Sequence, residues 1–271
     1  MAQLSLRYRH NHRFEPHYIS NEDVRIHAAK IRSQMNLGDR INVTLEDLKG
    51  IDRLQINDIE YDLWHDFDHQ LYDDEGQKVL GVFEYYPESE SEAVSICVSP
   101  VDSLSSGFLV LSTFAHELGH AIYDAPALIS NNRTPDLPGL EIEVNGKRAF
   151  RSVIETPNHL GTTSSALPEH VRLAEFRANE FMGSLLVPEN LLRDAVLDLA
   201  PQLAIEVREG DAELFAGTPD GRKKIFWNPV EYQLEMWQLT RAVAPKFGVS
   251  PAFIEVRLNR YGVAQETASA G

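Results

Sequence analysis

The sequence predicts an α+β protein in which a small antiparallel sheet packs on a core of helices and further helices close the C-terminal end. Three observations support this fold class. Residues 54–99 alternate polar and apolar side chains between turn-forming residues, as half-buried strands do. Residues 108–122 supply an apolar helical surface for burial, and residues 168–186 predict a second strong helix. The 43% hydrophobic and 24% charged residues are typical of a globular chain with a sizeable core.

Two helices are predicted ahead of the sheet. The first runs from its N-cap, Asn21, to a stop at Gly38. The second is short, because Thr44 and Asp47 have the spacing of a capping box and Gly50 follows one turn later.

Strands are predicted in three stretches. LQINDIEYDLW begins at Leu54, KVLGVFEYY follows an acidic turn at residues 73–76, and EAVSICVS covers residues 92–99. We expect an antiparallel sheet that packs on the helix after it. The single cysteine, Cys97, lies in the last strand, and we interpret it as a buried strand residue rather than a redox sensor.

The helix after the sheet carries the motif His116-Glu117-x-x-His120. Residues four apart share one face of a helix, so the two histidines can bind one Zn²⁺ ion. Glu117 points to the side of this pair, where a carboxylate can accept a proton from water activated by the metal. Ser105 or Ser106 is the predicted N-cap. Because buried charges must be paired or coordinated, we interpret the motif as a zinc site with one ion per chain.

A catalytic zinc ion needs a third protein ligand from another element. Gly119 is unfavourable inside a helix, which indicates that backbone or ligand comes close there. In the second strong helix, Glu175 can be the third ligand, while Asn179, four residues later, can hydrogen-bond a ligand histidine. Glu180 and His170 are rival ligands that spacing alone does not exclude.

Two other stretches contain suitable side chains. The run HDFDH at residues 65–69 has two histidines four apart, but its surroundings predict strand or loop, so we interpret it as a solvated loop rather than a second metal site. Asp220 lies in the turn of a hairpin predicted over residues 212–227, and we interpret it as a turn residue.

Residues 125–168 are rich in proline and are predicted to be irregular, with a tight hairpin at the Asn-Gly pair 145–146. Such a segment between two metal-bearing helices is often a lid or a substrate-binding surface. Peptide hydrolysis also needs an oxyanion stabiliser, and His159, His170 and Tyr123 are the candidates.

The C-terminal part is predicted to be helical around a second hairpin. One helix begins at Pro188, another covers residues 237–247, and a last one has Ser250 as N-cap with Pro251 in its first turn and ends at Gly262.

Composition limits the classes of function. A formal net charge of −16 argues against direct binding of nucleic acid and favours a basic partner, although solubility alone also explains an acidic surface. No apolar run approaches the roughly 20 residues of a membrane span, and the first residues lack the apolar region of a secretory signal. One cysteine excludes a disulfide framework. We therefore expect a cytoplasmic protein that does not enter membranes.

Three stretches resemble the ImmA/IrrE family of metallopeptidases. They are HELGHAI from His116, E-x-x-A-N-x-F-x-x-x-L-L-x-P from Glu175, and FGVSPAFIEVRLNRYG from Phe247. The likeness covers about residues 20–123 and 168–262. Arg177 departs from the family pattern, in which a second glutamate is common at this position, and the segment between the two metal-bearing helices is longer than the family's.

The resemblance implies a zincin-like helical core with a zinc helix, a glutamate helix and a C-terminal helical cap. It carries over His116, His120 and Glu175 as zinc ligands and Glu117 as the base. We therefore expect five parts: a flexible basic tail (1–20), a zincin-like metallopeptidase domain (21–200) with an irregular insert or lid (125–168), a hairpin with C-terminal helices (201–262) and a disordered end (263–271).

The predicted function is that of a zinc endopeptidase. Members of the family are associated with cleaving helix-turn-helix repressors in stress, phage or mobile-element regulation, so the resemblance implies a repressor or an antitoxin as the protein substrate. Two alternatives stay open: a protein that binds a repressor or antitoxin without cutting it, and the toxin component of a toxin–antitoxin pair. Glu117 argues against the first, because a structural zinc site needs no base beside its histidines.

Overall fold

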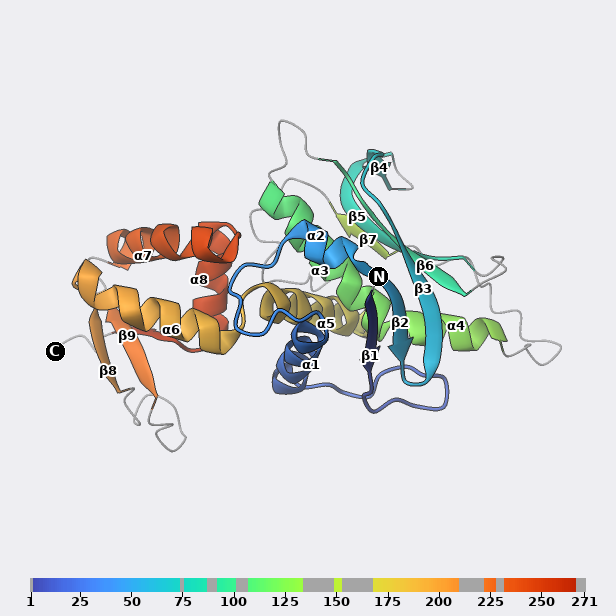
Figure 1. The fold of residues 1–271 in the computed structure, drawn as a ribbon, viewed down its shortest axis with the longest axis horizontal. Helices are drawn as coiled ribbons and strands as arrows, with labels where there is room; N and C mark the ends of the chain where they lie inside the picture. Colours follow the sequence, from blue (N-terminus) through green and yellow to red (C-terminus); the bar gives the residue numbers. More distant parts are fainter. Residues whose placement is uncertain are drawn as a thin grey trace. The chain divides into compact units, whose positions relative to one another are not determined.

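The computed structural model describes residues 2–73, 76–86, 92–100, 107–133, 149–152, 168–209, 222–227 and 232–266 of the 271-residue chain. It is a mixed α+β structure, shown in Figure 1, and it divides into two compact units. The first unit is formed by Met1–Gly38 and Val43–Leu186, and the second by Asp39–Asn42 and Val187–Gly271.

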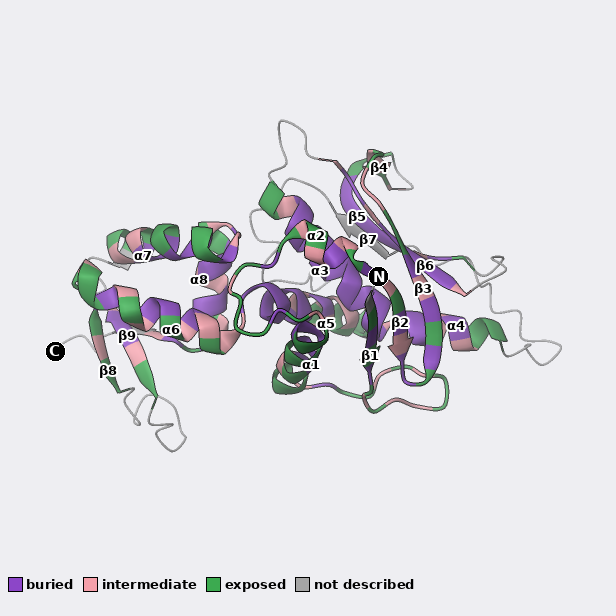
Figure 2. Ribbon diagram, viewed as in Figure 1, coloured by how far each residue is buried: buried purple, intermediate pink, exposed green. Residues whose placement is uncertain are grey.

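The first unit contains a sheet and the helices that cover it. Its strands are β1 (Ala2–Leu6), β2 (Ile51–Ile56), β3 (Ile59–Asp66), β4 (Leu71–Tyr72), β5 (Lys78–Tyr85), β6 (Ala93–Val98) and β7 (Ala149–Ser152). Its helices are α1 (Asn21–Gln34), α2 (Leu45–Lys49), α3 (Gly107–Tyr123), α4 (Ala125–Arg133) and α5 (Glu169–Leu186). In Figure 2, α3 and the strands beside it are the most continuously buried elements.

The sheet is larger than the sequence predicts, and it is mixed rather than antiparallel. Its strands pair along the path β1-β2-β3-β6-β5-β4, and β7 also pairs with β5. The pairs β1–β2 and β3–β6 are parallel, while the other pairs of this sheet are antiparallel. In both parallel pairs a long stretch of chain separates the two strands, 44 residues between β1 and β2 and 26 between β3 and β6, so local alternation of side chains could not reveal them.

The predicted flexible tail is wrong for residues 2–8. Strand β1 adds to the edge of the sheet because Leu4 and Leu6 alternate into the core, where they are fully or almost fully buried. The hydroxyl of Tyr8 then donates to the carbonyl oxygens of Ile122 and Tyr123 at 3.0 and 3.2 Å. The basic residues of this segment are typical of a solvated tail, and only the pairing with β2 makes its two leucines core residues.

The stretch predicted as one strand from Leu54 is a hairpin of β2 and β3. Asn57 and Asp58 form its turn with φ angles of 50° and 68°, which asparagine and aspartate tolerate better than most residues. The two predicted N-terminal helices are confirmed, with one correction. Ser20 rather than Asn21 is the N-cap of α1, and it forms a capping box with Asp23.

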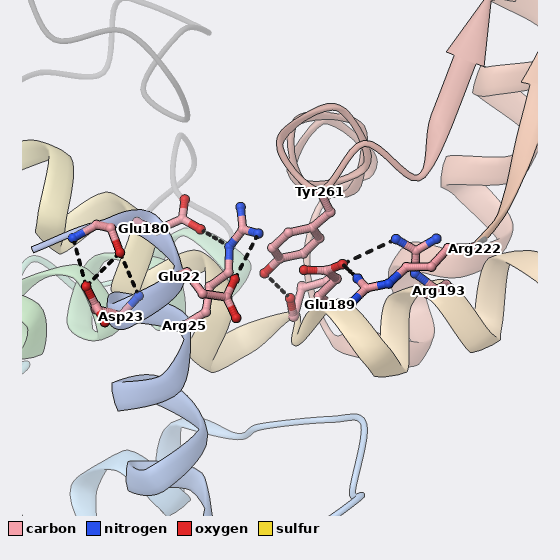
Figure 3. Close-up of polar contacts among 10 residues, drawn as sticks. Glu22, Asp23, Arg25, Glu180, Glu189, Arg193, Arg222 and Tyr261 are labelled. Carbon is pink, nitrogen blue, oxygen red and sulfur yellow. Dashed lines mark hydrogen bonds and ion pairs between the residues drawn. The ribbon is translucent and has the colours of Figure 1, made fainter. Parts of the chain in front are cut away.

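Helix α5 is held against α1 by polar contacts as well as by apolar packing. Arg25 Nε lies 2.9 Å from Oε1 of Glu180, a carboxylate that is fully buried (Figure 3). Arg32 Nη1 donates to the carbonyl of Leu185 at 2.7 Å and so satisfies one of the last carbonyls of α5.

The segment predicted as irregular, residues 125–168, contains helix α4 and strand β7. The apolar residues at the start of α4, among them Ala125 and Ile129, are fully buried, which explains why a helix forms despite Pro126 near its N-terminus. The predicted hairpin at residues 145–146 lies outside the described residues.

The second unit contains α6 (Glu189–Leu199), the 3₁₀ helix η1 (Ala200–Leu203), β8 (Glu206–Glu209), β9 (Lys223–Trp227), α7 (Tyr232–Phe247), α8 (Pro251–Arg260) and β10 (Ala264–Glu266). The predicted domain boundary after residue 200 is therefore too late, because α6 packs on α7 and β9. In Figure 3, Glu189 of α6 contacts Arg193 and Arg222.

Of the hairpin predicted over residues 212–227, the second strand is confirmed as β9. Its antiparallel partner β8 comes before the predicted range, and Asp220 lies outside the described residues. The predicted cap of α8 is also confirmed, with Ser250 as N-cap and Gly262 at a φ of 58° after its end. The predicted disordered end is wrong for β10, which pairs with β9 in parallel. None of the described helices combines the length and apolar character that crossing a bilayer requires.

Candidate metal-binding site

Helix α3 carries His116, Glu117 and His120 in the core of the first unit. Their relative exposures are 1%, 1% and 3%. The end of the helix is fixed by tyrosines from the sheet side, since the hydroxyl of Tyr61 donates to the carbonyl of Ala121 at 2.6 Å in addition to the bonds made by Tyr8. The helix that bears the motif is therefore a rigid, buried support for its side chains.

Gly119 lets α5 approach α3 closely. A Cβ atom at this position would lie 2.9 Å from the Cα of Ala178 and 3.3 Å from its Cβ, closer than packed side chains allow. The sequence prediction that backbone comes close at Gly119 is confirmed. The contact sets the depth at which α5 presents Glu175 to the two histidines.

His116, His120 and Glu175 form a cluster that can hold a metal ion. One ligand atom from each residue lies within 4.8 Å of the others, and no second group of three such side chains is found among the described residues. The Nε2 atoms of the two histidines are 3.2 Å apart. Glu175 Oε2 lies 3.4 Å from His116 Nε2, and its Oε1 lies 3.3 Å from His120 Nε2.

Asp124 orients His120, a role that the sequence analysis missed. Its Oδ2 lies 2.7 Å from His120 Nδ1, and because a carboxylate can only accept, Nδ1 carries the proton and Nε2 faces the cluster. Arg177 of α5 donates to the other oxygen of Asp124 at 3.1 Å. The available signal was the spacing, since Asp124 follows His120 by one helical turn.

The surroundings of the cluster favour positive charge. Burial would lower the pKa of His120, but its hydrogen bonds to Asp124 and Glu175 outweigh burial and raise this pKa to about 10. Burial would raise the pKa of Glu175, but the hydrogen bonds from His116 and His120 hold it well below its usual range. A site that stabilises a proton between these groups also stabilises a divalent cation in its place.

Glu117 faces β5. A Cβ atom at Gly81 of β5 would lie 3.3 Å from both Cγ and Oε1 of Glu117, and 2.4 Å from Cγ2 of Thr113. Only glycine fits here, so the strand backbone lies directly against the helical turn that carries Glu117. The side chain of Glu117 therefore packs against the sheet.

The rival third ligands lie elsewhere. Glu180 is buried in its ion pair with Arg25, and His170 is exposed in the first turn of α5. Asn179 was predicted to hydrogen-bond a ligand histidine. Its Oδ1 is buried and has no hydrogen-bond partner among the described residues, while Asp124 occupies the Nδ1 of His120.

Neither of the two described candidates for the oxyanion stabiliser, His170 and Tyr123, belongs to the metal-binding cluster. His159 lies outside the described residues, and His170 is exposed. Tyr123 is buried in the core with its hydroxyl 3.0 Å from Nδ1 of His27, and burial raises the pKa of Tyr123 well above its usual range. None of the three is supported by its position.

The HDFDH stretch is the predicted loop only in part, because His65 and Asp66 are the last residues of β3 and the loop begins at Phe67. His65 Nε2 lies 3.0 Å from the carbonyl oxygen of Lys49, and His69 Nδ1 lies 2.7 Å from Oδ2 of Asp66. The side chain of His69 is 77% exposed. Cys97 is partly buried on β6, with its sulfur 3.3 Å from the hydroxyl of Ser95.

Comparisons with known protein families, with curated proteins and with solved structures find no match to this chain.

Proposed function

We propose that this protein is a zinc-dependent endopeptidase with a zincin-like catalytic core. The convergence of His116, His120 and Glu175 beside the buried Glu117 carries the proposal. Two histidines and one carboxylate make the ligand set of catalytic zinc in many peptidases, with one position left for water. The clustered residues are also the ones that the sequence motifs resembling ImmA/IrrE metallopeptidases carry over as zinc ligands.

The distances within the cluster favour zinc. At a zinc–ligand distance of about 2.0–2.1 Å, the edge of a coordination tetrahedron is about 3.3 Å long. The Nε2 atoms of the two histidines are 3.2 Å apart, and the two oxygens of Glu175 lie 3.3 Å from Nε2 of His120 and 3.4 Å from Nε2 of His116, each close to the length of such an edge. A buried set of two nitrogens and one oxygen with these edges suits zinc better than magnesium or calcium, which prefer six or more oxygen ligands.

When bound, zinc supplies a Lewis acid that activates water and the scissile carbonyl. The protein's own groups supply the rest. Glu117 accepts the proton of the attacking water and delivers it to the leaving amine. Asp124 keeps the proton of His120 on Nδ1, and Arg177 holds Asp124 in the position for this bond. We assign no residue to the oxyanion.

The proposed substrate is a basic regulatory protein, either a helix-turn-helix repressor or an antitoxin. The net charge of −16 favours a basic partner. The resemblance to repressor-cleaving peptidases points to the same class. Neither argument identifies the scissile bond, so an unfolded general substrate such as casein serves as the first probe.

The test measures zinc content and proteolysis in the same samples. Wild type should hold one zinc per chain and cut casein, together with a repressor encoded beside its gene. Glu117→Ala should keep the zinc and lose the cleavage, whereas Glu175→Ala should lose the metal. Glu169→Ala is the matched control, because Glu169 lies exposed on the same helix as Glu175.

Two outcomes would change the proposal. If Glu175→Ala retains zinc as tightly as Glu169→Ala, the predicted ligand set is wrong. If Glu117→Ala binds the repressor and relieves repression as well as wild type, the protein acts by sequestration, and the peptidase proposal fails while the metal site stands.

A further inference from the structure

The outer edge of β5 lies beside the candidate catalytic residue. Val82 pairs with Cys97 of β6 and also with Phe150 of β7, so β6 and β7 occupy opposite edges of β5. Without β7, the segment Val79–Phe83 would be an open edge of the sheet among the described residues. Figure 1 shows β7 next to β5.

This edge is held against the turn of α3 that carries Glu117. The contact at Gly81 puts the strand backbone within van der Waals distance of Glu117 and Thr113. Gly81 is also paired with Arg151 of β7. A strand or peptide that pairs with this edge of β5 therefore lies one strand away from the contact with Glu117.

The edge of a strand recognises another strand mainly through its backbone. Its unpaired N–H and C=O groups can bind an extended peptide of almost any sequence. An endopeptidase needs its substrate in an extended form, because only then are successive backbone groups within reach. The edge of β5 thus offers what an extended substrate requires, and β7 already uses it.

We propose that β7 is the chain's own occupant of the Val79–Phe83 edge of β5, and that it competes there with the extended peptide that this edge would bind. The proposal rests on the proposed peptidase function for its biological meaning. The competition itself is a statement about binding and can be measured without any cleavage.

The pairing of β7 with the edge of β5 contributes little free energy. Strand β7 is four residues long, and its pairing with β5 is irregular between Val79 and Gly81. Short, interrupted ladders contribute little free energy, so another strand can replace them. If the edge is open in only a fraction of the molecules, the apparent affinity for a peptide is reduced by that fraction.

The test removes the backbone pairing of β7. Phe150→Pro/Arg151→Pro deletes two backbone N–H donors of the strand, whereas the control Phe150→Ala/Arg151→Ala changes the same side chains and keeps the donors. Both are made in the full chain with Glu117→Ala, so that peptides are bound without being cut. The probe is a fluorescein-labelled peptide with the sequence of residues 147–154.

The double proline variant (the proline pair) should bind the probe at least about tenfold more tightly than the double alanine variant (the alanine pair). This ratio is expected when β7 leaves the edge open in fewer than about one in ten molecules of the alanine pair. Hydrogen exchange should show new protection at residues 79–83 when the probe binds. Equal affinities, or protection elsewhere, would overturn the proposal. If the proline pair fails to fold, the alanine pair is used for the test. Excess probe should then lower the hydrogen-exchange protection of residues 149–152, because the probe displaces β7. Unchanged protection there would overturn the proposal.

Casein cleavage by the same pairs with Glu117 intact separates the two proposals. Probe binding at residues 79–83 without any cleavage leaves the binding edge in place and rejects the peptidase. Equal cleavage by both pairs, without protection at residues 79–83, leaves the peptidase in place and rejects the competing strand.

Discussion

Two regions of the first unit contain a pair of histidines four residues apart together with carboxylates, and they differ in almost every other respect. In α3, His116 and His120 are buried, and their Nε2 atoms lie 3.2 Å apart with Glu175 beside both. At the end of β3 and just after it, His65 and His69 contact separate partners. Only the first pair belongs to a group that can hold a metal ion.

The difference lies in the backbone rather than in the side chains. A helix places residues four apart on one face, whereas the chain from His65 to His69 leaves a strand and turns. The helical pair also has a third ligand from another element, which Gly119 admits by its small size. Ligand spacing in a sequence is therefore informative only together with the secondary structure that carries it.

The largest expected effect comes from removing one histidine of each pair. His120→Ala should weaken zinc binding by more than the roughly 10–100-fold that loss of an outer partner causes, because a ligand itself is lost. His69→Ala should leave the affinity within about twofold, since His69 is 77% exposed and lies outside the cluster. Competition with a fluorescent zinc chelator measures both.

Equal losses in the two variants would mean that zinc binds at the loop as well, and the contrast between the regions would disappear. Circular dichroism of each variant shows whether a loss of affinity reflects a loss of fold.

A smaller effect is expected from the carboxylate that bonds each histidine. Asp124 and Asp66 both accept from a histidine Nδ1 at 2.7 Å. Asp124→Asn should reduce zinc affinity by roughly 10–100-fold, because His120 loses the partner that fixes its proton. Asp66→Asn should not change it. Arg177→Met should act in the same direction as Asp124→Asn but more weakly, because Arg177 acts only through Asp124.

The readout is the zinc dissociation constant by chelator competition, with unfolding in urea as a check on the fold. If Asp124→Asn binds zinc like wild type, the orienting role of Asp124 is wrong, even if the variant is inactive.

The histidine pair was predictable because its information is local. The helix and the spacing of His116 and His120 follow from one short stretch of sequence, whereas spacing alone left Glu180 and His170 as rivals of Glu175, which the resemblance of its helix favours. The spacing of Asp124 from His120 is just as local, but spacing does not show that Asp124 rather than Asn179 bonds the histidine.

The sheet was predicted less well because its pairing is not local. Strand β1 lies within a basic terminal segment, and only its contact with β2 makes Leu4 and Leu6 core residues. The same holds for β7, which pairs with β5 across a long stretch of chain. Hydrophobic alternation identifies a strand of ordinary length, but not which strand it will join.

The close approach of α3 and α5 can be tested by adding one methyl group. Gly119→Ala should lower the free energy of unfolding by about 1–3 kcal/mol, since the new Cβ would lie 2.9 Å from the Cα of Ala178 and must push the helices apart. It should also weaken zinc binding, because Glu175 moves with α5. Gly107→Ala in the same helix is the control, since among the described residues nothing beyond its chain neighbours and its own helix backbone lies within 4 Å of a Cβ there.

Urea unfolding and chelator competition measure the two effects. A Gly119→Ala variant that is as stable as Gly107→Ala and binds zinc equally well would show that the helix contact does not position Glu175.

The smallest expected effect concerns His27, a buried histidine with a tyrosine rather than a carboxylate as its partner. Burial and, to a lesser degree, Lys30 lower the pKa of His27 below its usual value, despite the opposing effect of Asp23. The unfolded chain therefore binds this proton more readily than the folded one. The stability contribution is fully present above the unfolded pKa of about 6.5 and is lost as the pH falls through the lowered folded pKa.

His27→Phe should thus lose less stability than wild type between pH 7.5 and 5.5, measured by urea unfolding with the metal removed by a chelator. The ligand histidines are common to both proteins, so their titration cancels in the difference. A variant whose stability falls as steeply as that of wild type would show that His27 is not held neutral by its surroundings. The contrast with His120 would then fail, because that contrast rests on two carboxylates that favour the charged ring of His120 and on burial that favours the neutral ring of His27.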